Sequence, residues 1–211
     1  MTDAVEIVSD LVKIPSVSPF GRNETERRER FERCREVLAY LEEFLQKQGA
    51  QTEQLVFEGG HDKWWYPVPN LYAELTIGDR KAAGHKFLCY MGHIDVVPVG
   101  EEKLWRRPPF SGQIDEGFVW GRGATDMKGS VGAWMSALEE LKAGKGVGVN
   151  LTIGTLITGD EEWAAVNGSD KVLAWMKANG KNPDAFIVGE PSSRDYLGTH
   201  IKTGRRGSLV G

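Results

Sequence analysis

The sequence predicts an α/β fold in which helices cover the faces of a largely buried sheet. Two observations favour this class. Stretches with apolar residues at helical spacing alternate along the chain with short apolar stretches typical of strands. Of the 211 residues, 40% are hydrophobic, which is enough to fill a sizeable core. We therefore expect a layered α/β domain.

Two helices are expected before the first strand. Apolar residues at helical spacing predict a short helix over residues 2–13, ended by Pro15. A longer helix over residues 24–48 has an apolar stripe beneath a charged face, and Gly49 is suited to end it. Arginines and glutamates alternate on that charged face, so we interpret it as a solvated surface.

The rest of the chain contains five predicted strands and two more helices. Strands are expected at 51–56, 70–76 and 87–91. A Pro/Gly-rich stretch over 98–125 is too irregular for one element. Beyond it, the pattern predicts a helix over 127–142, a strand over 150–158, a helix over 169–179 and a strand over 184–188. The tryptophan-rich stretch 61–69 is interpreted as a loop that packs on the core, with a ligand surface as the alternative.

Composition and charge exclude several classes of function. A net charge of −4 with mixed signs does not favour a nucleic-acid partner. No apolar stretch approaches the roughly 18 residues that cross a bilayer, and no cleavable leader is recognisable, so no membrane partner is expected. Cys34 and Cys89 lie in apolar stretches, which predicts buried thiols rather than a disulfide. We therefore expect a cytoplasmic protein.

A histidine and several acids each follow a predicted strand or the irregular stretch. In α/β folds, functional groups collect at the carboxyl ends of the strands. Neutral imidazole and carboxylate oxygens are the ligands expected for a catalytic zinc ion or a similar divalent metal. The candidates are His93, Asp95, Asp126, Glu161, Glu162 and Glu190. Their shared placement predicts a metal site at one edge of the sheet.

Each candidate also has an ordinary interpretation when it is taken alone. His93 can bind metal through one ring nitrogen while the carboxylate of Asp95 accepts a hydrogen bond from the other. The alternative is a structural histidine beside a solvated aspartate. Asp126 precedes a predicted helix and can be its N-cap, or its two oxygens can join two metal ions. Glycines around Asp126 allow a tight backbone there.

The adjacent glutamates Glu161 and Glu162 are expected to project in different directions if the chain is extended. One can then bind metal while the other acts as general base toward a metal-bound water. The alternative is a pair of solvated acids, although both follow a buried strand. Glu190 has the same placement after the last predicted strand. Glycine-rich nucleotide motifs are incomplete here, so a nucleotide-binding domain is disfavoured.

Six segments together resemble the zinc aminoacylase and carboxypeptidase superfamily, the M20-type metallopeptidases. They occur in the family's order over nearly the whole chain. The segment GRRGS (204–208) and the NG at 167–168 are more similar to its succinyl-diaminopimelate desuccinylases than to its acetylornithine deacetylases or dipeptidases. The segments are MGHIDVVPVG (91–100), W-x-x-PPF (105–110), WGRGATDMKGS (120–130), TGDEE (158–162), VGEPS (188–192) and IKTGRRGSLVG (201–211).

The resemblance implies a three-layer α/β/α catalytic domain of the zinc-exopeptidase type, with a mostly parallel mixed sheet, over residues 1–200. It implies that residues 201–211 begin a lid and dimerisation domain whose remainder is absent. A histidine that completes the second metal site in the family would lie beyond residue 211. We therefore expect a homodimer for the full-length protein and little activity from this chain alone.

The resemblance also implies a ligand set for two divalent ions, zinc with cobalt as the alternative. His93, Asp126 and Glu190 would hold one ion. Asp126 would join it to a second ion that Glu162 also holds, and Glu161 would be the general base. These roles are carried over from the family's motifs, residue by residue.

Further roles follow from the same resemblance. Asp95 would orient His93, and the peptide between Asp126 and Met127 would be cis. Arg205 and Arg206 would pair with substrate carboxylates, since the guanidinium fork suits that geometry, with a surface or interface role as the alternative.

The implied activity is hydrolysis of an N-acyl amino acid, a small molecule. The specific reaction is removal of succinate from N-succinyl-LL-2,6-diaminopimelate in lysine and diaminopimelate biosynthesis. The alternatives are an acetylornithine deacetylase-like enzyme, another deacylase or metallo-dipeptidase, or a non-catalytic relative that keeps the fold. Ile94 and Trp163 depart from the family's usual threonine and small residue.

Overall fold

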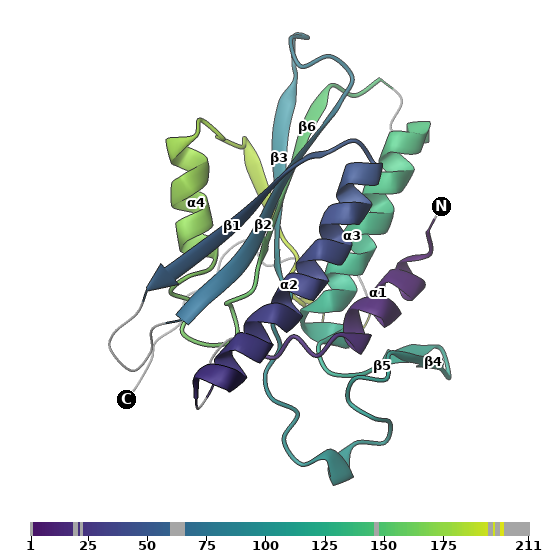
Figure 1. The fold of residues 1–211 in the computed structure, drawn as a ribbon. Helices are drawn as coiled ribbons and strands as arrows, with labels where there is room; N and C mark the ends of the chain where they lie inside the picture. The colour runs from purple at the N-terminus through teal and green to yellow at the C-terminus, as the bar shows by residue number, and fades with distance from the viewer. Residues whose placement is uncertain are drawn as a thin grey trace.

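The chain folds into three layers, which confirms the predicted architecture. The computed structural model describes residues 2–18, 21, 23–59, 66–145, 148–193, 196 and 199–200. Helices α1 (Ala4–Lys13), α2 (Glu24–Lys47) and α3 (Gly129–Glu140) cover one face of the main sheet, and α4 (Ser169–Ala178) covers the other (Figure 1). The strands are β1 (Gln51–Gly59), β2 (Tyr66–Ile77), β3 (Lys86–His93), β6 (Leu151–Thr158) and β7 (Ala185–Val188).

The direction of the strands decides where the functional groups meet. The order in the sheet is β1-β2-β6-β3-β7. Strand β2 is antiparallel to both of its neighbours, whereas β3 is parallel to β6 and β7. Within this sheet only β2 therefore runs against the others, which confirms a mostly parallel mixed sheet. The carboxyl ends of β3, β6 and β7 lie at the same edge.

Two apolar clusters hold the helices to the sheet. The larger lies under α1, α2 and α3 and includes the predicted helical stripe of α3, with Val131, Met135 and Leu138. The smaller lies under α4, where Val172 and Met176 pack near Leu156. Both cysteines are buried and unpaired, as predicted: Cys34 belongs to the first cluster and Cys89 to the second.

The predicted helix over 127–142 begins later than expected. α3 starts at Gly129 because the backbone of Asp126 (φ −124, ψ 99) and Met127 (φ −131, ψ 28) is not helical. Irregular turns η2 (Ala124–Lys128) and η3 (Leu141–Lys145) flank the helix. The stretch over 98–125 is irregular as predicted, apart from the 3-10 turn η1 (Glu102–Leu104) and the short hairpin of β4 (Gln113–Asp115) and β5 (Phe118–Trp120).

The loop interpretation of residues 61–69 was wrong for Tyr66–Pro69, which begin β2 and pair with β1. Pairing of β2 with β6 starts only at Asn70. Pro67 and Pro69 therefore occupy a part of the strand with a neighbour on one side, where a missing N–H is tolerated. Residues 60–65 lie outside the described residues.

The end of the chain is not part of the described structure. Residues 201–211, with Arg205 and Arg206, lie outside the described residues, so the domain boundary at 200 stays a prediction. Within the described part of the chain, every helix is too short or too polar to cross a membrane.

Candidate metal centre

His93 is the centre of the candidate site. It is the last residue of β3, and its side chain is buried with an exposed fraction of 1%. Its neighbours come from the turn before α3, from the loop after β6 and from the segment after β7. The carboxyl ends of three parallel strands and one helix-entry turn thus converge, as the sequence predicts.

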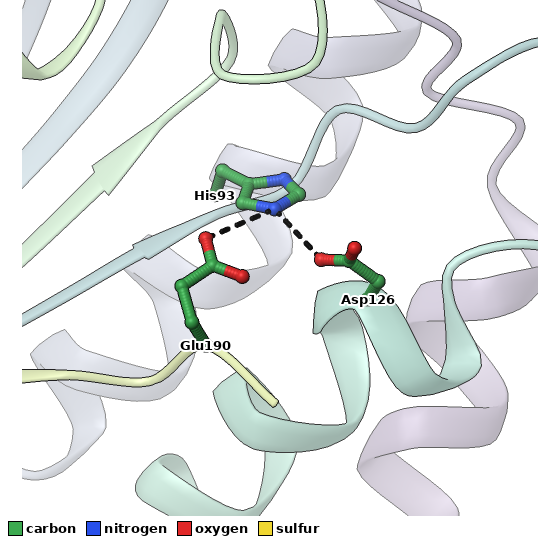
Figure 2. Close-up of side chains that lie close together, drawn as sticks. All are labelled: His93, Asp126 and Glu190. Carbon is green, nitrogen blue, oxygen red and sulfur yellow. Dashed lines mark hydrogen bonds and ion pairs between the residues drawn. The ribbon is translucent and has the colours of Figure 1, made fainter. Parts of the chain in front are cut away.

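Three carboxylates approach the same nitrogen of His93. The Nε2 atom lies 3.2 Å from Asp126 Oδ1, 3.6 Å from Glu190 Oε1 and 3.7 Å from Glu161 Oε2. Figure 2 shows Asp126 and Glu190 reaching His93 from two sides. The arrangement leaves one imidazole nitrogen facing several acceptor oxygens.

These side chains form two overlapping sets with metal-ligand geometry. In His93, Asp126 and Glu190, one ligand atom from each lies within 4.8 Å of the others. The same holds for His93, Glu161 and Glu162. The two glutamates do not diverge as expected from an extended chain, because the backbone bends at residues 161–163. Both carboxylates reach the same histidine.

The crowding of carboxylates changes the pKa values in the site. Burial and the neighbouring negative charges raise the pKa of Glu162 and of Glu190, partly offset by His93. Burial alone would lower the pKa of His93, but the surrounding carboxylates outweigh it and raise that pKa. The cluster therefore favours extra positive charge, either as protons or as a cation. A divalent cation with oxygen and imidazole ligands fits this need.

Asp95 acts differently from the prediction. The Nδ1 atom of His93 is 2.9 Å from the backbone carbonyl of Asp95, whereas the Asp95 carboxylate lies 3.6 Å away. That carboxylate instead accepts hydrogen bonds from the backbone N–H groups of Glu161, at 3.1 and 3.2 Å, and Glu162, at 3.0 Å. Desolvation raises its pKa to about 6. Asp95 thus holds both His93 and the glutamate loop.

Lys128 fixes the turn that presents Asp126 to the rest of the domain. The peptide between Asp126 and Met127 is cis, as predicted from the resemblance. Asp126 is not an N-cap, because α3 begins at Gly129 and its cap position makes no side-chain hydrogen bond. The fully buried Lys128 donates to the carbonyls of Leu11 and Ile14, both at 2.8 Å. It thereby ties the turn to the end of α1.

Sequence reasoning assigned no role to a second buried carboxylate, Asp160. It accepts hydrogen bonds from the Tyr66 hydroxyl, at 3.2 and 3.0 Å, and from the backbone N–H of Asn167, at 3.0 Å. Asn167 donates in turn to the carbonyls of Gly59 and Tyr66. The segment after β6 is therefore fixed at its far end as well. The only sequence signal was the position of Asp160 directly after a buried strand.

The other described histidines, His85 and His200, lie outside the candidate ligand sets. His85 contacts Thr152, with Nε2 and Oγ1 3.0 Å apart, and His200 contacts Thr199, with Nδ1 and Oγ1 2.8 Å apart. Of the two departures from the family pattern, Ile94 is buried in the core and Trp163 is 45% exposed.

Comparison with known proteins gives a consistent result. The family model described as Peptidase family M20/M25/M40 matches residues 89–204. A succinyl-diaminopimelate desuccinylase of Xanthobacter autotrophicus is 38% identical over 97% of this chain and 48% of its own length. The enzyme of that name from Rhodospirillum centenum is 41% identical over 99% of this chain and 48% of its own length. The chain thus spans about half the length of the curated relatives it matches.

Solved structures support the same fold. Human carnosine dipeptidase 1 superposes with a TM-score of 0.70 at 26% identity, over 88% of this chain and 37% of that one. The M20 family metallo-carboxypeptidase Sso-CP2 from Sulfolobus solfataricus gives 0.67 at 26% identity, over 90% of this chain and 37% of that one.

Proposed function

Because the chain belongs to peptidase family M20/M25/M40, we propose that it is the metal-binding part of an enzyme that removes succinate from N-succinyl-LL-2,6-diaminopimelate. The desuccinylase relatives at 38% and 41% identity support this substrate. The observation that carries the chemistry is the meeting of Asp126, Glu161 and Glu190 at one nitrogen of His93. A protein with a purely structural histidine has no need for three carboxylates there.

The residues present fit a pair of divalent ions, which we propose to be zinc, with cobalt as the alternative. His93, Asp126 and Glu190 would hold the first ion, and Asp126 and Glu162 would contribute to the second. When bound, such ions polarise the amide carbonyl and lower the pKa of the attacking water toward neutrality. The raised pKa values of Glu162 and Glu190 support this, since a cation would relieve the repulsion.

Glu161 is the proposed general base. Its side chain is 49% exposed, so a substrate water can reach it, and its Oε2 atom lies 3.7 Å from His93 Nε2. The carboxylate would take the proton of the attacking water and deliver it to the leaving amine nitrogen. Asp95 keeps Glu161 in place through its backbone N–H. The amide C–N bond then breaks, releasing succinate and the free amine.

Replacing Glu161 by glutamine tests this role in the full-length enzyme. Turnover should fall below detection while the bound metal per protein stays unchanged, because glutamine cannot accept the proton. The exposed Glu53 on β1 gives a matched control, and Glu53→Gln should keep full activity. If Glu161→Gln loses metal instead, Glu161 is a ligand. If it keeps its turnover, the hydrolase mechanism is wrong.

Metal stoichiometry is a separate test on these 211 residues. One ion would receive three described ligands, His93, Asp126 and Glu190, whereas the second would receive only Asp126 and Glu162. A zinc titration monitored by calorimetry should therefore show one tight site and a much weaker one. Two equally tight sites would contradict the proposed ligand sets.

Three further features of the proposal concern the whole protein. Arg205 and Arg206 would pair with substrate carboxylates, and the lid beginning at residue 201 would form a homodimer. The two buried free thiols support a cytoplasmic location. Light scattering on the full-length protein measures the dimer. Assays with N-acetylornithine and dipeptides beside the succinylated substrate measure the preference over the related deacylase and dipeptidase activities.

A further inference from the structure

A cleft in the irregular stretch between β3 and α3 has no role in the chemistry proposed above. Its volume is about 410 Å³, and it lies between the loop 99–107 and residues 120–122. The lining residues used below are Val99, Leu104, Trp105, Arg106, Trp120 and Arg122.

Both walls of the cleft are close in sequence to residues of the candidate metal centre. Val99 follows Asp95 by four residues, and Arg122 precedes Asp126 by four residues. Four residues of chain span at most about 14 Å. The two segments also touch each other, because a Cβ atom at Gly123 would come within 2.4 Å of Val96. The cleft walls therefore lie within about 14 Å of Asp95 and Asp126.

The two tryptophans form fixed apolar walls. The indole N–H of Trp105 donates to the carbonyl of Val99 at 2.9 Å, and that of Trp120 donates to the carbonyl of Asp115 at 3.1 Å. Both indole donors are therefore engaged within the protein. Guanidinium groups lie over both rings: Arg122 lies 5.0 Å from the centre of Trp105, and Arg106 and Arg107 lie 5.4 and 5.5 Å from that of Trp120.

The charge of the cleft is positive. Arg107 is neutralised by Asp115, with Nη2 and Oδ2 2.6 Å apart. Neither Arg106 nor Arg122 has a carboxylate partner within the described part of the chain; Arg122 donates only to the carbonyl of Pro98 at 3.3 Å. The lining acid Glu101 is paired with Lys103. Stacking on a ring leaves the in-plane N–H groups of a guanidinium free for a carboxylate.

We propose that this cleft is a carboxylate subsite, in which Arg106 and Arg122 hold the carboxylate at the end of the substrate remote from the scissile amide. The apolar side chains of Val99 and Leu104, which also line the cleft, would contact the aliphatic chain between that carboxylate and the metal centre. The subsite rests on the proposed function, because it assigns the far end of the same amide substrate. A long amino-dicarboxylate is the amine class that it fits.

Binding of pimelate, a seven-carbon dicarboxylate, tests the subsite without turnover. In a titration of the full chain as purified, followed by NMR, pimelate should shift the indole N–H signals of Trp105 and Trp120. The indole N–H signal of Trp134, which donates to Thr155 and lies outside the cleft, should not shift. Arg122→Gln should weaken the pimelate affinity read from these signals about tenfold or more, as expected for losing charge-assisted hydrogen bonds.

Two variants control for misfolding. Arg106 is exposed, so Arg106→Gln should leave the fold intact and still weaken pimelate several-fold. Arg35 on α2 also stacks on a ring, at 6.0 Å from Phe31, but lies outside the cleft, and Arg35→Gln should bind pimelate like the parent. Unshifted indole signals, or equal affinity in the parent, Arg106→Gln and Arg122→Gln, would overturn the proposal.

Kinetics of the full-length enzyme separate the subsite from the reaction itself. Arg122→Gln should raise KM about tenfold for N-succinyl-diaminopimelate, yet not for Nα-succinyl-lysine, which lacks the remote carboxylate. An equal change for both substrates would refute the subsite and leave the hydrolase intact. Absence of turnover in the parent, together with pimelate binding in the cleft, would instead refute the proposed hydrolase.

Discussion

Two sets of carboxylates lie within one region of this molecule and are stabilised in opposite ways. Asp95 and Asp160 are buried, with exposed fractions of 0% and 1%, and they accept hydrogen bonds from backbone N–H groups. The side chains of Asp126 and Glu190 are 52% and 38% exposed and face a shared histidine. The protein itself satisfies the buried set, whereas the exposed set calls for a cation. The first set builds the site and the second would bind the metal.

The largest effect should come from the exposed set. Replacing Asp126 by asparagine removes one negative charge from the centre, and it should lower turnover by at least about a thousandfold because metal-supplied stabilisation is lost. Zinc content per protein should fall in parallel. The thermal unfolding of the metal-free variant should match that of the metal-free parent. A metal-loaded and active variant would show that Asp126 is not a ligand.

A buried carboxylate that touches the site should have a smaller effect. In Asp95→Asn, an amide NH₂ replaces one acceptor oxygen opposite the N–H groups of Glu161 and Glu162. We expect kcat or zinc affinity to fall about 10- to 100-fold, as for other groups that orient metal ligands. Asp160→Asn is the comparison, because Asp160 holds the far end of the same segment. It should change stability more than kcat, and the opposite ranking would reverse the roles assigned to these two residues.

The stability of the metal-free protein and its affinity for zinc should change with pH in opposite directions. The pKa values of His93, Glu162 and Glu190 are raised and that of Asp95 is raised to about 6, so the metal-free native protein holds extra protons. Its stability should therefore fall as the pH rises through about 6. Zinc affinity should rise over the same range, by about tenfold per pH unit for each proton released. Urea unfolding with a chelator, and zinc competition titrations, at pH values on either side of 6 measure the two trends. If stability and zinc affinity changed with pH in the same direction, the two effects would not arise from the same protonated groups.

The smallest effect is expected from Tyr66, which donates a hydrogen bond to the buried Asp160. Tyr66→Phe removes the hydroxyl that donates to Asp160, and it should lower the free energy of unfolding by about 1.5 kcal/mol. Tyr196 is 78% exposed, so Tyr196→Phe is a matched control without loss. Chemical denaturation measures both variants. A stability of Tyr66→Phe equal to that of the parent would mean that the backbone N–H of Asn167 suffices for Asp160.

The sequence by itself predicted the layers and the position of the candidate metal centre. Periodic apolar stretches predict the bounds of α2 and β6 to within one residue. The rule that parallel strands end at one edge brings Glu161 and Glu190 to His93, whereas Asp126 comes from the turn before α3. These inferences depend on local spacing and on general strand geometry, which a single sequence carries. The bend that turns Glu161 and Glu162 toward one histidine has no such local signature.

Only the tertiary structure decided which atoms support that centre. The hydrogen bond from His93 goes to a backbone carbonyl of Asp95, and the carboxylate of Asp95 serves a loop 66 residues further along the chain. Asp160 meets Tyr66 across 94 residues, and Lys128 meets Leu11 across 117. A polar group that the packed core shields from water needs a hydrogen-bond partner inside the protein. Which groups are shielded, and which partners lie beside them, depends on the whole fold.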